Sequence, residues 1–161
     1  MIVVSDTSPI LNLAVIGRLD LLVSLYHQVL IPPAVGRELT RSDSAASLIH
    51  LGCCPWLVVA SAQDQTRVRQ LCAELDPGEA EAIVLALERR ADLLLVDERR
   101  GRRAAAAFGL RVIGLLGILA EAKRAGLIER VRPVLDDLIG RAGFWIGADL
   151  HAKVLTELGE G

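Results

Sequence analysis

Five short apolar runs alternate along the chain with longer segments in which apolar residues recur at helical spacing. The runs predict β-strands over residues 2–5, 29–31, 57–59, 92–97 and 111–113. The other segments predict helices over residues 9–16, 21–25, 64–74, 77–87, 115–125, 127–139 and 148–158, and a short one that carries Glu38. Strands that alternate with helices over this length predict an α/β fold with a parallel sheet covered on both faces.

Two of the predicted helices carry start signals. Ser8 can cap the first of them, with Pro9 at its first position, and Asp76 can cap the helix that Pro77 opens. The chain has no internal repeat, low-complexity tract or flexible linker, so we expect a single domain over residues 1–161.

Composition excludes some classes of protein but does not identify a function. No apolar run approaches the roughly 20 residues of a membrane span, and no basic segment precedes an apolar stretch at the N-terminus. We therefore expect a cytoplasmic protein without membrane association. Cys53, Cys54 and Cys72 form neither an even disulfide set nor a metal-binding pair, and we expect them to be small buried side chains.

The net charge of −2 excludes a protein that coats nucleic acid with its whole surface, so any such binding needs a local patch. The three histidines show no ligand spacing, which argues against zinc. The phosphate-binding loop, dinucleotide-binding and nucleophile-elbow motifs are absent as well.

The acidic residues can be sorted by the edge of the sheet at which they fall. Asp6 and Asp97 each follow a predicted strand, and ligand sites of parallel sheets lie outside the carboxyl ends of the strands. Asp92 begins the strand that Asp97 follows, which places it at the opposite edge, roughly 16 Å away at about 3.3 Å per residue. Asp6 and Asp97 are therefore site candidates, and Asp92 is not.

Helical geometry favours Glu79 over its acidic neighbours. With about 100° per residue, Glu79 shares a face with Ile83, whereas Glu81 and Glu88 fall on the opposite, solvent face. A capping box with Asp76 explains Glu79 equally well, and the two roles are compatible. Glu38 taken alone resembles an ordinary surface residue.

An ordered series of motifs resembles the PIN-domain nuclease family, in a bacterial and archaeal branch related to toxin ribonucleases. The first motif is DTSP, at Asp6-Thr7-Ser8-Pro9. The second has the form LDxGEAEAIxLA and spans residues 75–86. Leu93-Leu94-Leu95-Val96-Asp97-Glu98 and Gly101-Arg102 follow, so that the likeness covers about residues 2 to 160.

The resemblance implies a three-layer α/β/α sandwich around a mostly parallel sheet. It also implies a site for Mg²⁺ or Mn²⁺ formed by Asp6, Glu38, Glu79 and Asp97, with Ser8 as a supporting hydroxyl. Glu79 stands where many relatives have Asp, which lengthens one ligand arm.

The implied activity is metal-dependent hydrolysis of RNA. Many relatives are toxins of toxin–antitoxin pairs, so the expected partners are RNA, a small antitoxin protein and a second copy in a homodimer. Arg99 and Arg102, directly after Asp97, are candidates for holding RNA phosphates. The alternative is a catalytically weak PIN-like module that binds RNA or protein.

Overall fold

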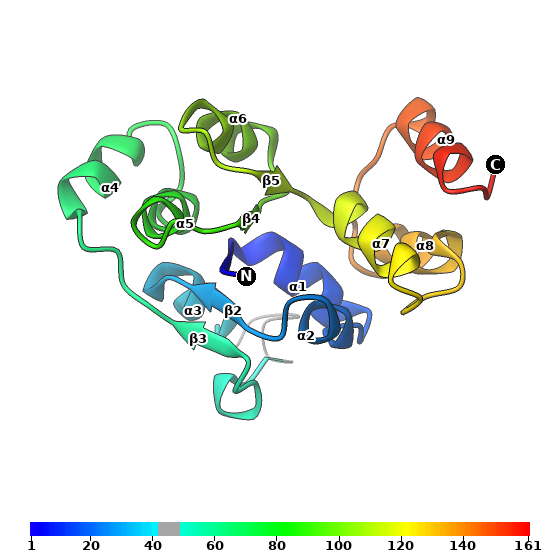
Figure 1. Cartoon of the computed structure of the whole chain (residues 1–161), viewed down its shortest axis with the longest axis horizontal. Helices are drawn as coiled ribbons and strands as arrows, with labels where there is room; N and C mark the ends of the chain where they lie inside the picture. The colour runs from blue at the N-terminus through cyan, green and yellow to red at the C-terminus, as the bar shows by residue number, and fades with distance from the viewer. Residues whose placement is uncertain (42–48) are drawn as a thin grey trace.

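The computed structural model describes residues 1–41 and 49–161 and contains a five-stranded parallel sheet (Figure 1). Its strands are β1 (Val3–Ser5), β2 (Val29–Ile31), β3 (Leu57–Val59), β4 (Leu93–Leu95) and β5 (Val112–Ile113). The spatial order is β3-β2-β1-β4-β5, so the first strand of the chain lies at the centre. Every pairing is parallel, which confirms the predicted fold class.

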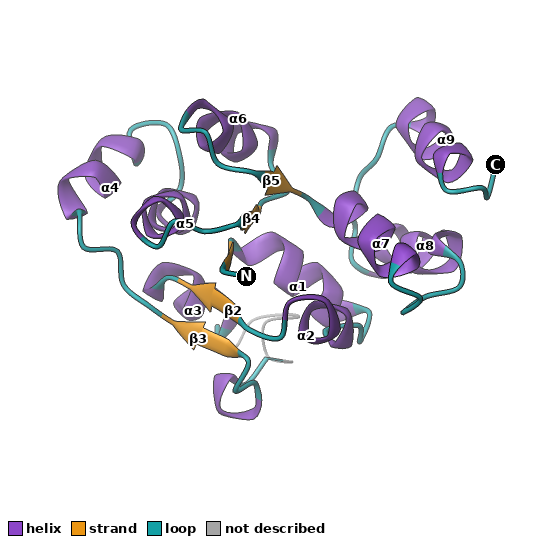
Figure 2. Ribbon diagram, viewed as in Figure 1, coloured by secondary structure: helices purple, strands orange, loops and turns teal. Residues whose placement is uncertain are grey.

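Helices connect and surround these strands (Figure 2). They are α1 (Thr7–Val15), α2 (Asp20–Tyr26), α3 (Pro33–Leu39), α4 (Gln65–Leu71), α5 (Pro77–Glu88), α6 (Arg99–Ala107), α7 (Leu115–Arg124), α8 (Val131–Arg141) and α9 (Ala148–Glu157), with a 3₁₀ turn η2 at Leu51–Cys53. Among the described residues, no helix combines the length and hydropathy that crossing a bilayer demands.

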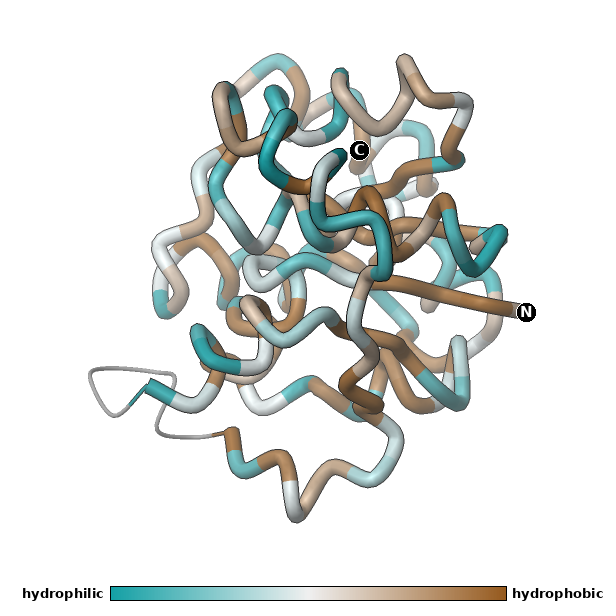
Figure 3. The backbone as a smooth tube through the Cα atoms, turned by 90° about the vertical axis from the view of Figure 1, so that its left-hand side faces the viewer, coloured by the Kyte–Doolittle hydropathy of each residue, from teal (hydrophilic) through white to brown (hydrophobic). Residues whose placement is uncertain are grey.

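The sheet separates two hydrophobic cores because side chains alternate between its faces. Val3 and Leu93 face a core shared with α1, α2, α7 and α8, whereas Val4 and Leu94 face a core shared with α4, α5 and α6. The two groups of helices lie on opposite sides of the strands in Figure 1. In Figure 3 the tube is strongly hydrophobic from the N-terminus inward, as expected for a central strand. The predicted three-layer arrangement is thus confirmed.

Helix α5 is buried along much of its length, and the carboxylates on its polar face form hydrogen bonds with neighbouring segments. Glu81, predicted to face solvent, is instead half-buried and accepts a hydrogen bond from the Ala34 amide at the start of α3 (3.3 Å). Glu88 is exposed and accepts hydrogen bonds from the amides of Gln63 and Asp64 (2.7 and 2.8 Å). Carboxylates on this face therefore tie α5 to its neighbours.

Two helices begin two or more residues away from the predicted position. Helix α1 begins at Thr7 with Asp6 as its N-cap residue, not Ser8, so Pro9 lies within the first turn, where no backbone donor is needed. Helix α8 begins at Val131, four residues after the predicted start. The prediction of buried cysteines was wrong for Cys53 and Cys72, which lie exposed at a turn and a helix end.

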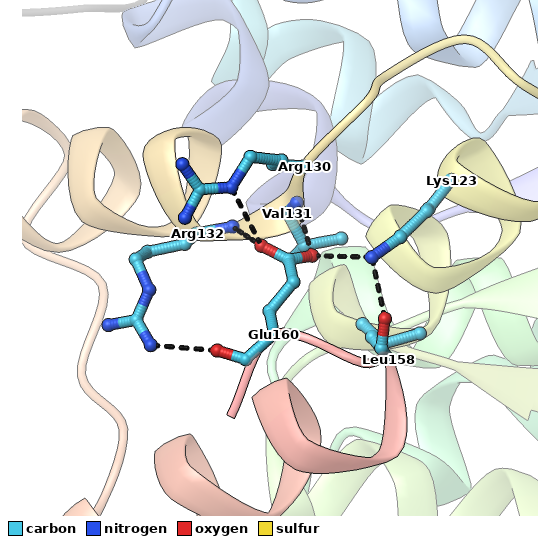
Figure 4. A network of polar contacts seen from close by, with 6 residues as sticks. All are labelled: Lys123, Arg130, Val131, Arg132, Leu158 and Glu160. Carbon is cyan, nitrogen blue, oxygen red and sulfur yellow. Dashed lines mark hydrogen bonds and ion pairs between the residues drawn. The ribbon is translucent and has the colours of Figure 1, made fainter.

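A carboxylate from the far end of the chain fixes the start of α8 (Figure 4). Glu160 accepts hydrogen bonds from the backbone amides of Val131 (2.8 Å) and Arg132 (3.0 Å). The ammonium group of Lys123 lies 2.9 Å from the same carboxylate, whose side chain is only 4% exposed. Burial alone would raise the pKa of Glu160, but these amides and Lys123 lower it to about 2.

We expect Glu160→Gln to lower the free energy of unfolding by about 1–3 kcal/mol, because the substitution weakens a charged helix cap. The folded-state pKa is depressed, so this stabilisation is present above pH 4.5 and is lost as the pH falls toward 2. Urea denaturation at pH 7 and pH 3 measures both effects. The matched control is Glu157→Gln on the exposed side of α9, and equal stability of the two variants at pH 7 would contradict the prediction.

Candidate active site

The candidate site lies where the sheet's connections diverge. From the central strand β1, the order runs through β2 in one direction and through β4 in the other, and ligands of such sheets bind outside the carboxyl ends at this point. Asp6 directly follows β1, and its amide donates a hydrogen bond to the carbonyl of Leu95, the last residue of β4 (3.0 Å). Asp92 lies at the opposite edge, as predicted, where it accepts a hydrogen bond from the amide of Ile2.

Three carboxylates surround the α-carbon of Gly78 in the first turn of α5. A Cβ atom at this position would lie 3.2 Å from Glu38 Oε1, 3.3 Å from Asp6 Oδ1 and 3.4 Å from Asp76 Oδ1. Such contacts are tight, so the absence of a side chain at residue 78 lets these oxygens approach. Helix α3 therefore brings Glu38, which local sequence could not distinguish from a surface residue, to the carboxylate of Asp6.

Glu79 lies next to this group and is only 3% exposed. Its amide donates a hydrogen bond to Asp76 Oδ1 (2.8 Å), which confirms Asp76 as the helix cap. The reciprocal bond from the Asp76 amide to the Glu79 carboxylate does not occur among the described residues, so the predicted capping box is only half formed. The Glu79 side chain packs instead on Gly101 of α6, at the mouth of the site.

Burial and mutual repulsion oppose ionisation of these acids. Burial is the largest cause that raises the pKa of Asp6, and together with the charges of Asp76, Glu38 and Glu98 it brings the pKa to about 7, against the opposing hydrogen bond from the Thr7 amide. Burial likewise raises the pKa of Glu79 to about 8, with Asp76 and Asp6 as the strongest neighbouring charges. Without a cation, the folded protein therefore holds protons on this cluster near neutral pH.

Asp97 has a different environment. Its Oδ1 accepts a hydrogen bond from the Leu115 amide at the start of α7 (2.7 Å) and occupies the space that a side chain at Gly114 would fill. Burial raises its pKa, while the Leu115 amide and Arg102 act in the opposite direction. Glu98, which sequence reasoning did not single out, adds negative charge at Asp6, Glu79 and Asp97 alike.

Two buried oxygen atoms lack hydrogen-bond partners among the described residues, namely Asp97 Oδ2 and Thr7 Oγ1. Buried polar atoms are almost always paired, so each of these atoms is a position at which a ligand or water could bind. Thr7 was not predicted as a site residue, although it directly follows Asp6. Ser8, which was predicted, is half-buried in the same turn.

The donor set suits a hard divalent cation, since it consists of carboxylate oxygens whose repulsion a cation would relieve. Within residues 1–41 and 49–161, however, no three His, Cys, Asp or Glu side chains are arranged to hold a metal ion as they stand. The chemistry of the residues therefore fits Mg²⁺ or Mn²⁺, and binding would require the carboxylates to move inward.

Comparison with known families decides the class of the protein. A family model described as a PIN domain matches residues 2–160. The chain belongs to the PIN-domain family. PIN domains are generally nucleases and typically use divalent metals, which makes hydrolysis the general class of activity here. No curated protein matches the chain.

Asp6→Asn is expected to stabilise the metal-free protein at pH 8 by about 1–4 kcal/mol, because it removes a buried charge. The folded-state pKa values of Asp6 and Glu79 are raised, so the folded protein binds more protons than the unfolded chain between about pH 4 and pH 8. The free energy of unfolding of the natural protein should therefore fall over this range.

Urea denaturation with a chelator at pH 5 and pH 8 measures this effect, with Asp137→Asn on the exposed face of α8 as the control. A natural protein that is more stable at pH 8 than at pH 5 would contradict the proposed cost of burying Asp6.

Proposed function

We propose that this PIN-domain protein is a metal-dependent ribonuclease that hydrolyses phosphodiester bonds of RNA. The observation that carries the proposal is the convergence of Asp6, Glu38 and Asp76 oxygens around Gly78, at the edge where Asp97 also lies. Asp6, Glu38, Glu79 and Asp97 would bind Mg²⁺ or Mn²⁺. Asp76 and Glu98, whose side chains are exposed, would add negative charge to the rim.

The carboxylates would act by orienting a bound cation and by holding protons. Bound to these oxygens, Mg²⁺ or Mn²⁺ would supply an acidified water and neutralise charge at the scissile phosphate. Asp6 is rigidly positioned, since its amide is bonded to β4. The fixed bond between Asp97 Oδ1 and the Leu115 amide leaves Asp97 Oδ2 as the free ligand atom. The Thr7 hydroxyl and Ser8 would support the same end of α1.

Arg99 and Arg102 begin α6 beside the carboxylates and would hold the RNA backbone on either side of the scissile phosphate. Arg102 already acts electrostatically on Asp97, which supports a position close to the ligands. Arg99 borders the cavity that contains Glu79. Both side chains are exposed and can reach a phosphate in solvent.

We further propose that the nuclease acts as the toxin of a toxin–antitoxin pair, as a homodimer inhibited by a small antitoxin. The support is the resemblance of its DTSP and LDxGEAEAIxLA motifs to the PIN toxins. Expression of the chain alone should arrest growth of a bacterial host, and Asp6→Asn should relieve that arrest.

The decisive experiment compares cleavage of single-stranded and structured RNA by the natural protein and by its Asp6→Asn and Asp97→Asn variants. We expect cleavage to need Mg²⁺ or Mn²⁺, to stop on addition of a chelator, and to fall about 100-fold or more in each variant. Asp137→Asn provides the matched control, because it makes the same chemical change on the exposed surface of α8.

Cleavage that persists in both variants would indicate a contaminating nuclease and would eliminate the proposed site. The alternative function, a PIN-like module that binds RNA or protein with little catalysis, has its own support: no three ligands are preassembled among the described residues. Well-folded natural protein that binds RNA but cleaves none in either metal would favour that alternative.

A further inference from the structure

The outer edge of β3 pairs with no other described strand. β3 is the last strand on its side of the sheet, and Figure 1 shows it at the sheet's margin. The amide of Ala60, just after β3, donates a hydrogen bond to the carbonyl of Ile31 in β2 (2.9 Å). Alternate residues of a strand direct their backbone groups to opposite sides. The N–H and C=O groups of Val59 therefore point away from β2.

The side chain at this edge is apolar and accessible. Val59 is 47% exposed, and its Cγ2 atom would lie 3.7 Å from a Cβ atom at Gly36, so it rests on α3 with its other side in solvent. Residues 49–63, which contain β3, include no Lys, Arg, Asp or Glu. Unpaired backbone groups beside uncharged, β-branched side chains are the features that lead an edge strand to pair with another strand.

The opposite edge of the sheet is protected against such pairing. β5 is only two residues long, the exposed Arg111 directly precedes it, and α6 and α7 pack against it. Short length, a charged flank and covering helices are devices by which proteins block pairing at an edge. Within the described part of the chain, the sheet thus protects one edge and leaves the other open. This difference indicates that β3 has a partner.

A second copy of this chain is the partner that fits the edge. A two-fold axis places the residues beside it opposite the same segment of the other copy, so a charge there would face a like charge. The uncharged stretch 49–63 avoids that repulsion and offers no charge by which a different partner could be selected. Two-fold symmetry also makes equal strands antiparallel, and an antiparallel edge can satisfy its N–H groups with the C=O groups of its copy.

We propose that the protein forms a homodimer in which β3 pairs antiparallel with β3 of a second copy, with the two Val59 residues opposite each other. Each Val59 N–H donates to the other Val59 carbonyl, and the two side chains pack across the axis. The inference rests on the homodimer of the proposed function and locates its interface.

The arrangement has a consequence for the candidate sites. Antiparallel pairing joins the two parallel sheets into one and turns the carboxyl ends of their strands in opposite directions. The two carboxylate clusters therefore lie at opposite edges of the joined sheet. Each of them remains open to its own RNA, because the interface is built from β3 and not from the site.

Charged variants of Val59 test the interface. Val59→Lys and Val59→Asp each place like charges across the axis, and the aliphatic stem of the lysine can still cover Gly36. We expect the natural protein to be a dimer at about 100 μM and each variant to raise the dimer dissociation constant about 10-fold or more. An equimolar mixture of the two variants should restore the dimer, because opposite charges then meet. Analytical ultracentrifugation measures all four samples, and circular dichroism checks that each variant is folded.

The matched control is Leu150→Lys on α9, which introduces the same charge at an apolar residue that is 48% exposed. Its dimer should be as stable as that of the natural protein. A dimer that persists in Val59→Lys, or that Leu150→Lys weakens as much, would overturn the β3 interface and leave a homodimer formed elsewhere. A mixture of the two Val59 variants that stays monomeric would overturn the two-fold pairing of Val59.

A natural protein that is monomeric at about 100 μM would overturn the homodimer together with its interface, even if an extended peptide of another protein pairs with β3. None of these measurements involves RNA or metal. The ribonuclease proposal is therefore decided separately, by its own cleavage assay.

Discussion

Repulsion among buried carboxylates is the main physical constraint on the part of the molecule outside the carboxyl ends of the strands. Asp6 and Glu79 are nearly inaccessible to solvent, and Glu38 and Asp76 approach Asp6 across the bare α-carbon of Gly78. Such a cluster opposes folding unless protons or a cation compensate its charge. The pairing of β1 with β4 and the packing of α3 against α5 hold the backbone in place around the cluster. The site is thus strained electrostatically while its backbone is regular.

The C-terminal part of the chain illustrates the opposite use of a buried acid. The side chain of Glu160 is only 4% exposed, yet two backbone amides and Lys123 surround it, and its pKa falls where that of Glu79 rises. The difference lies in the neighbours, since burial acts in the same direction on both. A buried carboxylate with partners holds a helix in place, whereas one surrounded by other acids is available to a ligand.

Local sequence was sufficient for the fold class and for the positions of some residues of the candidate site. The apolar run before Asp97 and the β-branched run before Asp6 predicted which acids share an edge, and the face of Ile83 separated Glu79 from Glu88. Glu38 needed the family resemblance, because its approach to Asp6 depends on how α3 packs. The approach of Asp76 to Asp6, the contribution of Glu98, and the bond from Leu115 to Asp97 arise from contacts between elements that no local pattern encodes.

The position of β1 at the centre of the sheet also has a consequence for folding kinetics. Its pairing with β4 joins residues 90 positions apart, as in the bond between Ile2 and Asp92. Contacts of such long range form slowly, because a large loop must close before any of them is gained. Asp6 and Asp97 come to the same edge only when that loop has closed. Partly folded chains therefore carry the acids without the site, and assembly of the site coincides with completion of the fold.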